Sequence, residues 1–103
     1  MASRTQTQTN TATKAELKKP KKYFVIIHND DYTSMEFVVE VLMNIFNKSE
    51  QDASNIMLEV HQNGKGVAGE YIYDIAVTKK MQTEQLAAQR GFPLKISLEE
   101  AVN

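Results

Sequence analysis

Side chains that could bind a cation are concentrated in one short stretch, residues 28–37. It begins with a histidine, an asparagine and two aspartates, whose nitrogen and oxygen atoms accept hydrogen bonds, and it continues with apolar side chains such as Met35. The preceding residues, 23–27, are β-branched or aromatic and predict a strand, while Thr33 and Glu36 have the spacing of a helix capping box. Binding residues often lie in loops between such rigid elements. The sequence therefore predicts a pocket for a positive group attached to an apolar one.

Asn29, Asp30 and Asp31 also have a purely structural interpretation, because asparagine and aspartate are the usual residues of turns before helices. His61 is a further candidate and lies four residues after Met57, so the two side chains share one helix face. Histidines at the border of an apolar face, like methionines, are more often structural than functional. These residues alone leave both a binding site and a well-formed turn open.

A metal or catalytic site would have to use four side chains, because cysteine is absent: His28, Asp30, Asp31 and His61. Their spacing does not match a zinc-binding helix motif, and neighbouring side chains in a strand face different ways, so the four need not converge. The chain also lacks a nucleophile elbow, a phosphate-binding loop and a dinucleotide fingerprint. An enzyme is therefore the weakest alternative, and we expect no catalytic residue, metal or cofactor.

The 103 residues, with 42% hydrophobic and 24% charged side chains, fit one small domain with an appendage. Residues 1–22 carry six basic side chains and one acidic one, a net charge of +5, which leaves −6 for residues 23–103. An acidic body argues against binding to nucleic acid. Residues 1–22 have almost nothing to bury and predict a disordered basic tail. No apolar run is long enough for a membrane span or resembles a secretory signal, so we expect a cytoplasmic protein.

The rest of the chain predicts a small α+β domain. Three segments have the apolar spacing or the composition of helices: residues 34–46, 49–63 and 78–90. Two segments alternate like strands: residues 67–77, with a bulge at Gly69, and residues 94–99. Gly64 and Gly91 are expected to end helices. With the first strand, the order is βααβαβ, which predicts a small antiparallel three-stranded sheet covered on one face by three helices.

These residues resemble the ClpS adaptors, which select proteins by their N-terminal residue and deliver them to a Clp AAA+ protease in the bacterial N-end rule pathway. The resemblance rests on four motifs: Asn29-Asp30-Asp31-Tyr32-Thr33-x-Met35-Glu36-Phe37-Val38, Met57-Leu58-x-Val60-His61 with Gly64-Lys65, Thr78-Lys79, and Pro93-Leu94. It spans residues 23–100 in register. Ser34 departs from the family, which often has proline at the first helical position, so we expect a slightly looser helix start.

The resemblance implies a role for each side chain of the predicted pocket. Asn29, Asp31 and His61 would accept hydrogen bonds from the α-ammonium group of a substrate. Asp30 and Thr33 would hold its first peptide groups. Five apolar side chains would line the cavity for its first side chain: Met35, Val38, Met57, Val60 and Leu94. Family members accept Leu, Phe, Tyr or Trp there, and Met35 resembles the gate that disfavours β-branched side chains.

The resemblance also implies partners. They are N-degron substrates and the N-terminal domain of a ClpA-like unfoldase, which would contact Asp74 and Lys79 and engage the tail. Without the resemblance, both residues are simply solvated charges. We expect a monomer. A competing interpretation is a protein-interaction module similar to the C-terminal domain of the ribosomal stalk protein, in which the acidic loop is structural and no degron pocket exists.

Overall fold

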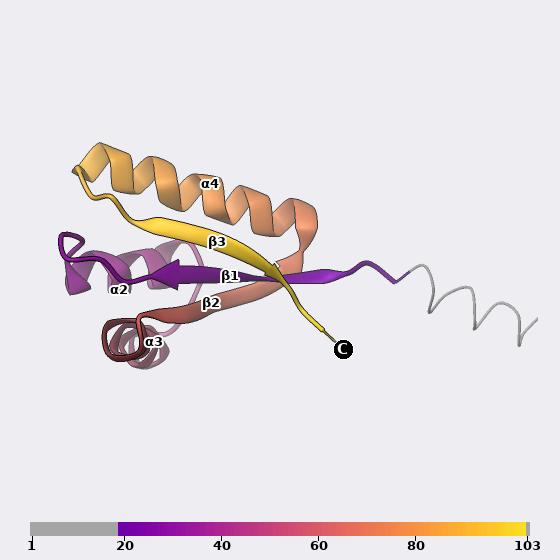
Figure 1. Cartoon of the computed structure of the whole chain (residues 1–103), viewed down its shortest axis with the longest axis horizontal. Helices are drawn as coiled ribbons and strands as arrows, with labels where there is room; N and C mark the ends of the chain where they lie inside the picture. The colour runs from indigo at the N-terminus through magenta and orange to yellow at the C-terminus, as the bar shows by residue number, and fades with distance from the viewer. Residues whose placement is uncertain (1–18, 103) are drawn as a thin grey trace, which may run out of the picture.

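The computed structural model describes residues 19–102, along which strands and helices follow in the predicted order β-α-α-β-α-β. The strands are β1 (Lys22–His28), β2 (Lys65–Ile72) and β3 (Lys95–Glu100), and the helices are α2 (Met35–Asn44), α3 (Glu50–Asn63) and α4 (Tyr73–Arg90) (Figure 1). Most of the tail predicted over residues 1–22 lies outside the described residues. Lys22, however, already belongs to β1, so the strand begins one residue earlier than predicted.

The apolar run at the start of the domain forms the middle strand of the sheet. The strand order is β2-β1-β3, and both pairs are antiparallel. Between Val25 and Ile26 the register shifts, since Val25 pairs with Gly69 and Ile26 pairs with Val67. Ala68 is therefore the extra residue of a bulge, which lies one residue before Gly69, where the sequence predicted it.

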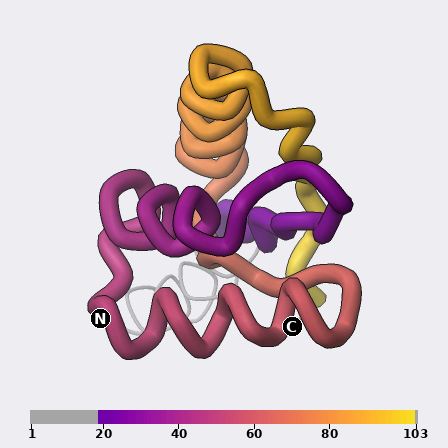
Figure 2. The backbone as a smooth tube through the Cα atoms, turned by 90° about the vertical axis from the view of Figure 1, so that its left-hand side faces the viewer, coloured from indigo at the N-terminus to yellow at the C-terminus, as the bar shows by residue number. Residues whose placement is uncertain are grey.

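The helices lie on one side of the sheet, and α3 flanks its β2 edge (Figures 1 and 2). Helix α4 packs across all three strands, while α3 packs against α2 and β2. Val25 and Ile27 of β1 point into the resulting core and are fully buried, together with Val41 and Leu42 of α2. The α+β architecture predicted from the sequence is confirmed.

The strand predicted over residues 67–77 is wrong in its second half, because β2 ends at Ile72 and α4 begins at Tyr73. Tyr73, Ile75 and Val77 alternate in the sequence like strand residues, and short apolar runs of this kind do not separate strand from helix. The helix buries three small side chains: Ala76, Thr83 and Ala87. Their spacing of seven and four residues puts them on one helical face, which lies against the sheet.

Helix α2 is capped by Ser34, so the capping box predicted to start at Thr33 is wrong. The Ser34 hydroxyl accepts a hydrogen bond from the N–H of Phe37 at 3.1 Å. Serine is one of the best N-cap residues, and here it precedes the first helical position. Ser34 is therefore the N-cap of α2 and not its first helical position, while the loosening expected relative to proline stays a prediction. The helix ends at Asn44, two residues before the predicted end.

The predicted ends of α3 and α4 are confirmed. The Ser49 hydroxyl accepts a hydrogen bond from the N–H of Asp52 at 3.1 Å and caps α3. Gly64 and Gly91 follow the two helices with φ angles of 91° and 77°, which favour glycine. Within residues 19–102, none of the helices has the length and apolarity that crossing a membrane requires.

Candidate functional site

The loop between β1 and α2 is folded around the carboxylate of Asp30. Its Oδ1 accepts hydrogen bonds from the N–H groups of Tyr32 and Thr33, at 2.8 and 2.7 Å, and its Oδ2 accepts one from the Thr33 hydroxyl at 2.7 Å. Burial alone would raise the pKa of Asp30, but these hydrogen bonds outweigh burial and hold the pKa below its ordinary value. The ionised carboxylate stabilises the loop at neutral pH, and this contribution is lost as the pH falls through the lowered pKa.

A main-chain hydrogen bond joins this loop to the end of α3. The N–H of Asn29 donates to the carbonyl of Gly64 at 2.9 Å. His61 lies in the last turn of α3, and the N–H of Gly64 closes that helix by donating to the carbonyl of Val60, also at 2.9 Å. Two segments far apart in the sequence therefore meet where the sequence placed its candidate acceptors.

A surface hollow of about 360 Å³ lies at this junction. Its lining consists of eight residues: Asn29, Asp30, Asp31, Tyr32, Thr33, Ser34, Met35 and His61. The structure thus brings together all five polar residues predicted for ammonium and peptide binding, and adds Met35. Tyr32 and Ser34 also line the hollow and were not predicted as site residues. Tyr32 is 77% exposed, and its only sequence signal is its place inside the loop motif.

Three acceptors of this hollow are unused within the described part of the chain. The side chains of Asn29, Asp31 and His61 are exposed and make no hydrogen bond to residues 19–102. No lysine or arginine lines the hollow. An amide oxygen, a carboxylate and an imidazole nitrogen are thus available to a small cation with several N–H donors.

The apolar side chains predicted for the cavity lie in different places. Met35 is 47% exposed and lines the hollow. The other four belong to the hydrophobic core or pack against it: Val38, Met57, Val60 and Leu94. Val38 follows Met35 by one helical turn, and Met57 precedes His61 by one turn, so the core continues directly from the polar lining.

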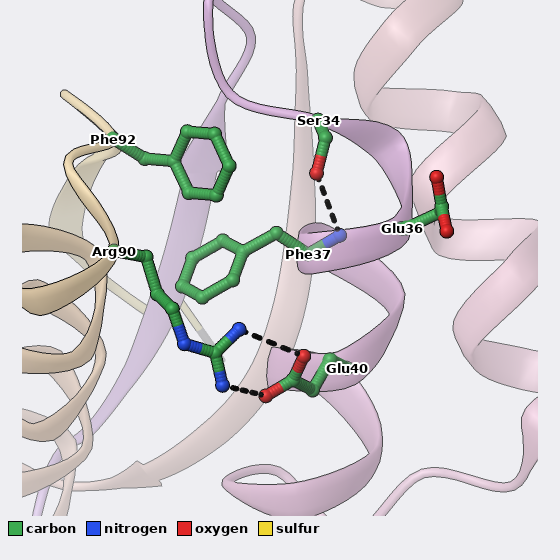
Figure 3. A pocket seen from close by; sticks show the side chains of 6 residues that line it. All are labelled: Ser34, Glu36, Phe37, Glu40, Arg90 and Phe92. Atoms are coloured by element: carbon green, nitrogen blue, oxygen red, sulfur yellow. Dashed lines mark hydrogen bonds and ion pairs between the residues drawn. The ribbon is translucent and has the colours of Figure 1, made fainter.

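A second hollow, of about 340 Å³, lies where α2 meets the end of α4 (Figure 3). Arg90 donates two hydrogen bonds to Glu40, at 3.2 and 2.7 Å, and its guanidinium lies 5.6 Å from the centre of the Phe37 ring. The rings of Phe37 and Phe92 are 5.0 Å apart. Glu36 also lines this hollow and takes no part in that pair, but the contacts of Arg90 with Glu40 and Phe37 hold α2 on α4.

His28 lies apart from the acceptors of the loop. Its Nε2 and the Ser97 hydroxyl are 2.6 Å apart on β1 and β3. Among residues 19–102, no three His, Cys, Asp or Glu side chains lie close enough together to hold a metal ion. The four-residue metal or catalytic set considered from the sequence therefore does not assemble in this structure.

Comparison with known proteins decides the family. A family model described as the ATP-dependent Clp protease adaptor protein ClpS matches residues 18–97. The chain belongs to the ClpS family. ClpS proteins are named as adaptors of the ATP-dependent Clp protease, and the stalk-like interaction module considered from the sequence is not favoured.

The ClpS relatives extend over almost the whole chain. The ClpS of Clostridium acetobutylicum is 49% identical over 100 residues, which cover 97% of this chain and 99% of the relative. The ClpS of Acetivibrio thermocellus is 54% identical over 87 residues, covering 84% and 88%. A solved structure of Agrobacterium tumefaciens ClpS2 bound to L-phenylalaninamide aligns with a TM-score of 0.77 and 38% identity, covering 81% of this chain and all of that one.

The two residues predicted to contact an unfoldase have different environments in this ClpS chain. Asp74 is exposed in the first turn of α4. Lys79 is half-buried, donates from Nζ to the carbonyl of Ile45 at 2.6 Å, and lies 5.9 Å from the centre of the Tyr71 ring. Lys79 therefore caps the C-terminal end of α2, and its interpretation as a simply solvated charge is wrong.

The Gly64 turn gives a prediction with a matched control. Gly64→Ala and Gly91→Ala both force alanine into the left-handed region with no atom within 4 Å of the new methyl group. Each should cost about 1 kcal/mol, a fall in Tm of about 4–8 °C. Only Gly64→Ala disturbs the bond to Asn29, so only it should also weaken ligand binding. Equal binding by the two variants, measured alongside thermal unfolding, would contradict this.

Proposed function

We propose that this chain binds proteins through a free N-terminal Leu, Phe, Tyr or Trp and delivers them to a Clp AAA+ protease. One observation carries the proposal: Asn29, Asp31 and His61 present unused acceptors in one hollow that also contains Met35. Phenylalaninamide, bound by the Agrobacterium neighbour, combines an ammonium group, an amide and a phenyl side chain. A substrate that begins with Phe offers the same three groups, and one that begins with Leu, Tyr or Trp offers another large apolar side chain in place of the phenyl group.

Each part of the hollow is assigned one part of the substrate. The three ammonium N–H groups donate to Asn29, Asp31 and His61, while Asp30 and Thr33 contact the first peptide groups. The first side chain is proposed to pass Met35 and to insert among four residues of the adjoining core, which do not line the hollow themselves: Val38, Met57, Val60 and Leu94.

The expected binding energies explain why both the ammonium and the side chain are needed. Burying one large apolar side chain contributes ~1.5–3 kcal/mol, and each hydrogen bond with a charged group contributes ~1.5–3 kcal/mol. Association itself costs ~4–15 kcal/mol, so the side chain alone does not suffice. Three such hydrogen bonds and the side chain together contribute ~6–12 kcal/mol, which reaches micromolar affinity, about −8 kcal/mol, only when the cost of association is at the low end of its range. An internal Leu or Phe lacks the ammonium and leaves the three acceptors unpaired.

The end of β2 and the start of α4 are the surface proposed for the N-terminal domain of a ClpA-like unfoldase. Asp74 lies there beside two exposed apolar side chains, Ile72 at 38% and Tyr73 at 54% exposure. Lys79 supports this surface by tying α4 to the end of α2. The basic residues of the N-terminal segment are proposed to engage the unfoldase during delivery.

Fluorescence anisotropy tests the substrate proposal with peptides that differ only in the first residue. Peptides beginning with Leu, Phe, Tyr or Trp should bind in the micromolar range, and their N-acetylated forms should bind at least 100-fold more weakly. A peptide beginning with Ser is the control for the side chain. Equal binding of free and acetylated peptides would reject the role of the ammonium group.

Met35 is expected to control which first residues enter. Met35→Ala removes a flexible side chain from the rim of the hollow, so peptides beginning with Ile or Val should gain at least tenfold in affinity relative to Phe. Met43→Ala is the matched control, because Met43 is an exposed methionine of the same helix that does not line the hollow. Selectivity that stays unchanged in Met35→Ala would remove Met35 from the gate.

A further inference from the structure

The face of the sheet turned away from the helices has an apolar centre. In the middle of this face, Ile26 of β1 pairs with Val67 of β2; Val67 is 41% exposed, whereas Ile26 is only 5% exposed, so Val67 supplies most of the accessible apolar surface of this pair. Together with Phe24 they line a hollow of about 260 Å³, at whose edge Glu59 of α3 also lies. Figure 2 shows no helix over β1 and β3 on this side. We call this surface the open face.

The two ends of the open face carry opposite charges. At one end, the register places Lys65 of β2 and Lys95 of β3 on either side of His28. At the other end, it places Glu70 of β2 and Glu99 of β3 on either side of Phe24. All four charged side chains are exposed. Along the strands, the open face therefore runs from a row with two lysines, through an apolar centre, to a row with two glutamates, beyond which Lys22 of β1 lies on the same face.

The environment of His28 agrees with this arrangement. Burial lowers the pKa of His28, and the ammonium groups of Lys95 and Lys65 lower it further. No carboxylate contributes to the shift. The basic end is thus a cluster of like charges without a negative partner at hydrogen-bond distance among residues 19–102.

We infer that the open face binds the open face of a second copy of this chain. A two-fold axis that lies in the interface and crosses the strands at right angles turns the basic end of one copy onto the acidic end of the other. Strand β2 then lies over β2 and β3 over β3, so Lys65 faces Glu70 of the second copy, and Lys95 faces its Glu99. Such an isologous contact closes as a dimer, and aligned packing of two sheets is a common arrangement.

The size of the open face makes this dimer weak. Three strands of about six residues cover roughly 300 Å², well below the ~800 Å² per partner of a standard interface. We therefore expect the chain to be monomeric at micromolar concentration, as predicted from the sequence, and to form the dimer only at higher protein concentrations. None of the residues named for the open face lines the hollow at Asn29 and His61, so this inference does not rest on the proposed substrate.

Sedimentation equilibrium of the full chain tests the inference between 20 µM and 1 mM. At 50 mM NaCl the weight-average mass should rise toward the dimer with concentration, and at 500 mM NaCl the association should weaken about tenfold, because the four charge pairs are screened. A mass that stays monomeric at 1 mM and low salt would overturn the inference. If residues 1–18 of the same chain occupied the open face instead of a second copy, the mass would likewise stay monomeric, and the inference would be wrong.

Charge reversal gives the sharper test. Lys65→Glu with Lys95→Glu places like charges opposite one another in all four proposed pairs, and so does Glu70→Lys with Glu99→Lys, so each variant alone should lose association at least tenfold. An equimolar mixture should associate at least as tightly as the unmodified chain, which a misfolded variant could not do. Glu50→Lys with Asp52→Lys is the control, since it gives the charge change of the basic variant at the exposed start of α3. Association by either variant alone, or a mixture that stays monomeric, would refute the dimer.

Discussion

Asp31→Ala should abolish most ligand binding while leaving the fold intact. The Asp31 side chain makes no hydrogen bond within residues 19–102, so its loss should change Tm by less than about 2 °C. Removing a charged partner of the ammonium should cost about 2–3 kcal/mol, or roughly 30–150-fold in affinity for a Phe-initiated peptide. Anisotropy titrations and thermal unfolding of the same preparations measure both effects.

The neighbouring aspartate supplies the control for this variant. Asp30 accepts three hydrogen bonds inside the loop, so Asp30→Ala should lower both Tm and affinity, whereas Asp30→Asn keeps an acceptor for the main chain and should be milder. If Asp31→Ala bound within threefold of the unmodified chain, the proposed ammonium site would be wrong.

Lys79→Met should destabilise the fold far more than a surface lysine would. The substitution leaves the Ile45 carbonyl without its partner and removes a positive charge from the end of α2. A hydrogen bond from a charged group is worth ~1.5–3 kcal/mol, so the fall in Tm should be about 6–24 °C.

Lys80→Met is the matched variant one residue along the chain. Lys80 only pairs with Glu84 at 3.0 Å on the helix surface, and such pairs contribute about 0.3–0.5 kcal/mol. Its Tm should fall by no more than about 4 °C. Equal thermal unfolding curves for the two variants would show that Lys79 does not support α2. This comparison also separates an effect of Lys79 on delivery from an effect on folding.

The polar half of the candidate site could be predicted from the sequence because it depends on local signals. A strand, a turn rich in asparagine and aspartate, and a helix stop at Gly64 place Asn29, Asp31 and His61 at element ends. The local sequence does not predict the hydrogen bond from Asn29 to Gly64, which brings the end of β1 next to the end of α3. The resemblance to ClpS supplied that juxtaposition before the structure did.

Other features depend on tertiary contacts and were not predictable from local pattern. Tyr73, Ile75 and Val77 alternate like a strand, yet the burial of Ala76 makes the segment helical. The sequence predicts Lys79 to be a solvated surface charge, because nothing in the local pattern indicates that its partner is the Ile45 carbonyl at the end of a different helix. The N-cap of α2 is Ser34 and not the predicted Thr33, because the Thr33 hydroxyl donates its hydrogen bond to Asp30.

The contact of Asn29 with Gly64 couples two motions that would otherwise be separate. The loop can swing away from the last turn of α3 only if that hydrogen bond breaks, so widening of the site and exposure of the Gly64 carbonyl at the helix end are one event. Exchange of the Asn29 amide proton with solvent therefore reports how often the site opens. A bound substrate N-terminus that bridges Asn29 and His61 should slow this exchange. The exchange rate of this one amide proton would then measure how much of the site is occupied by substrate.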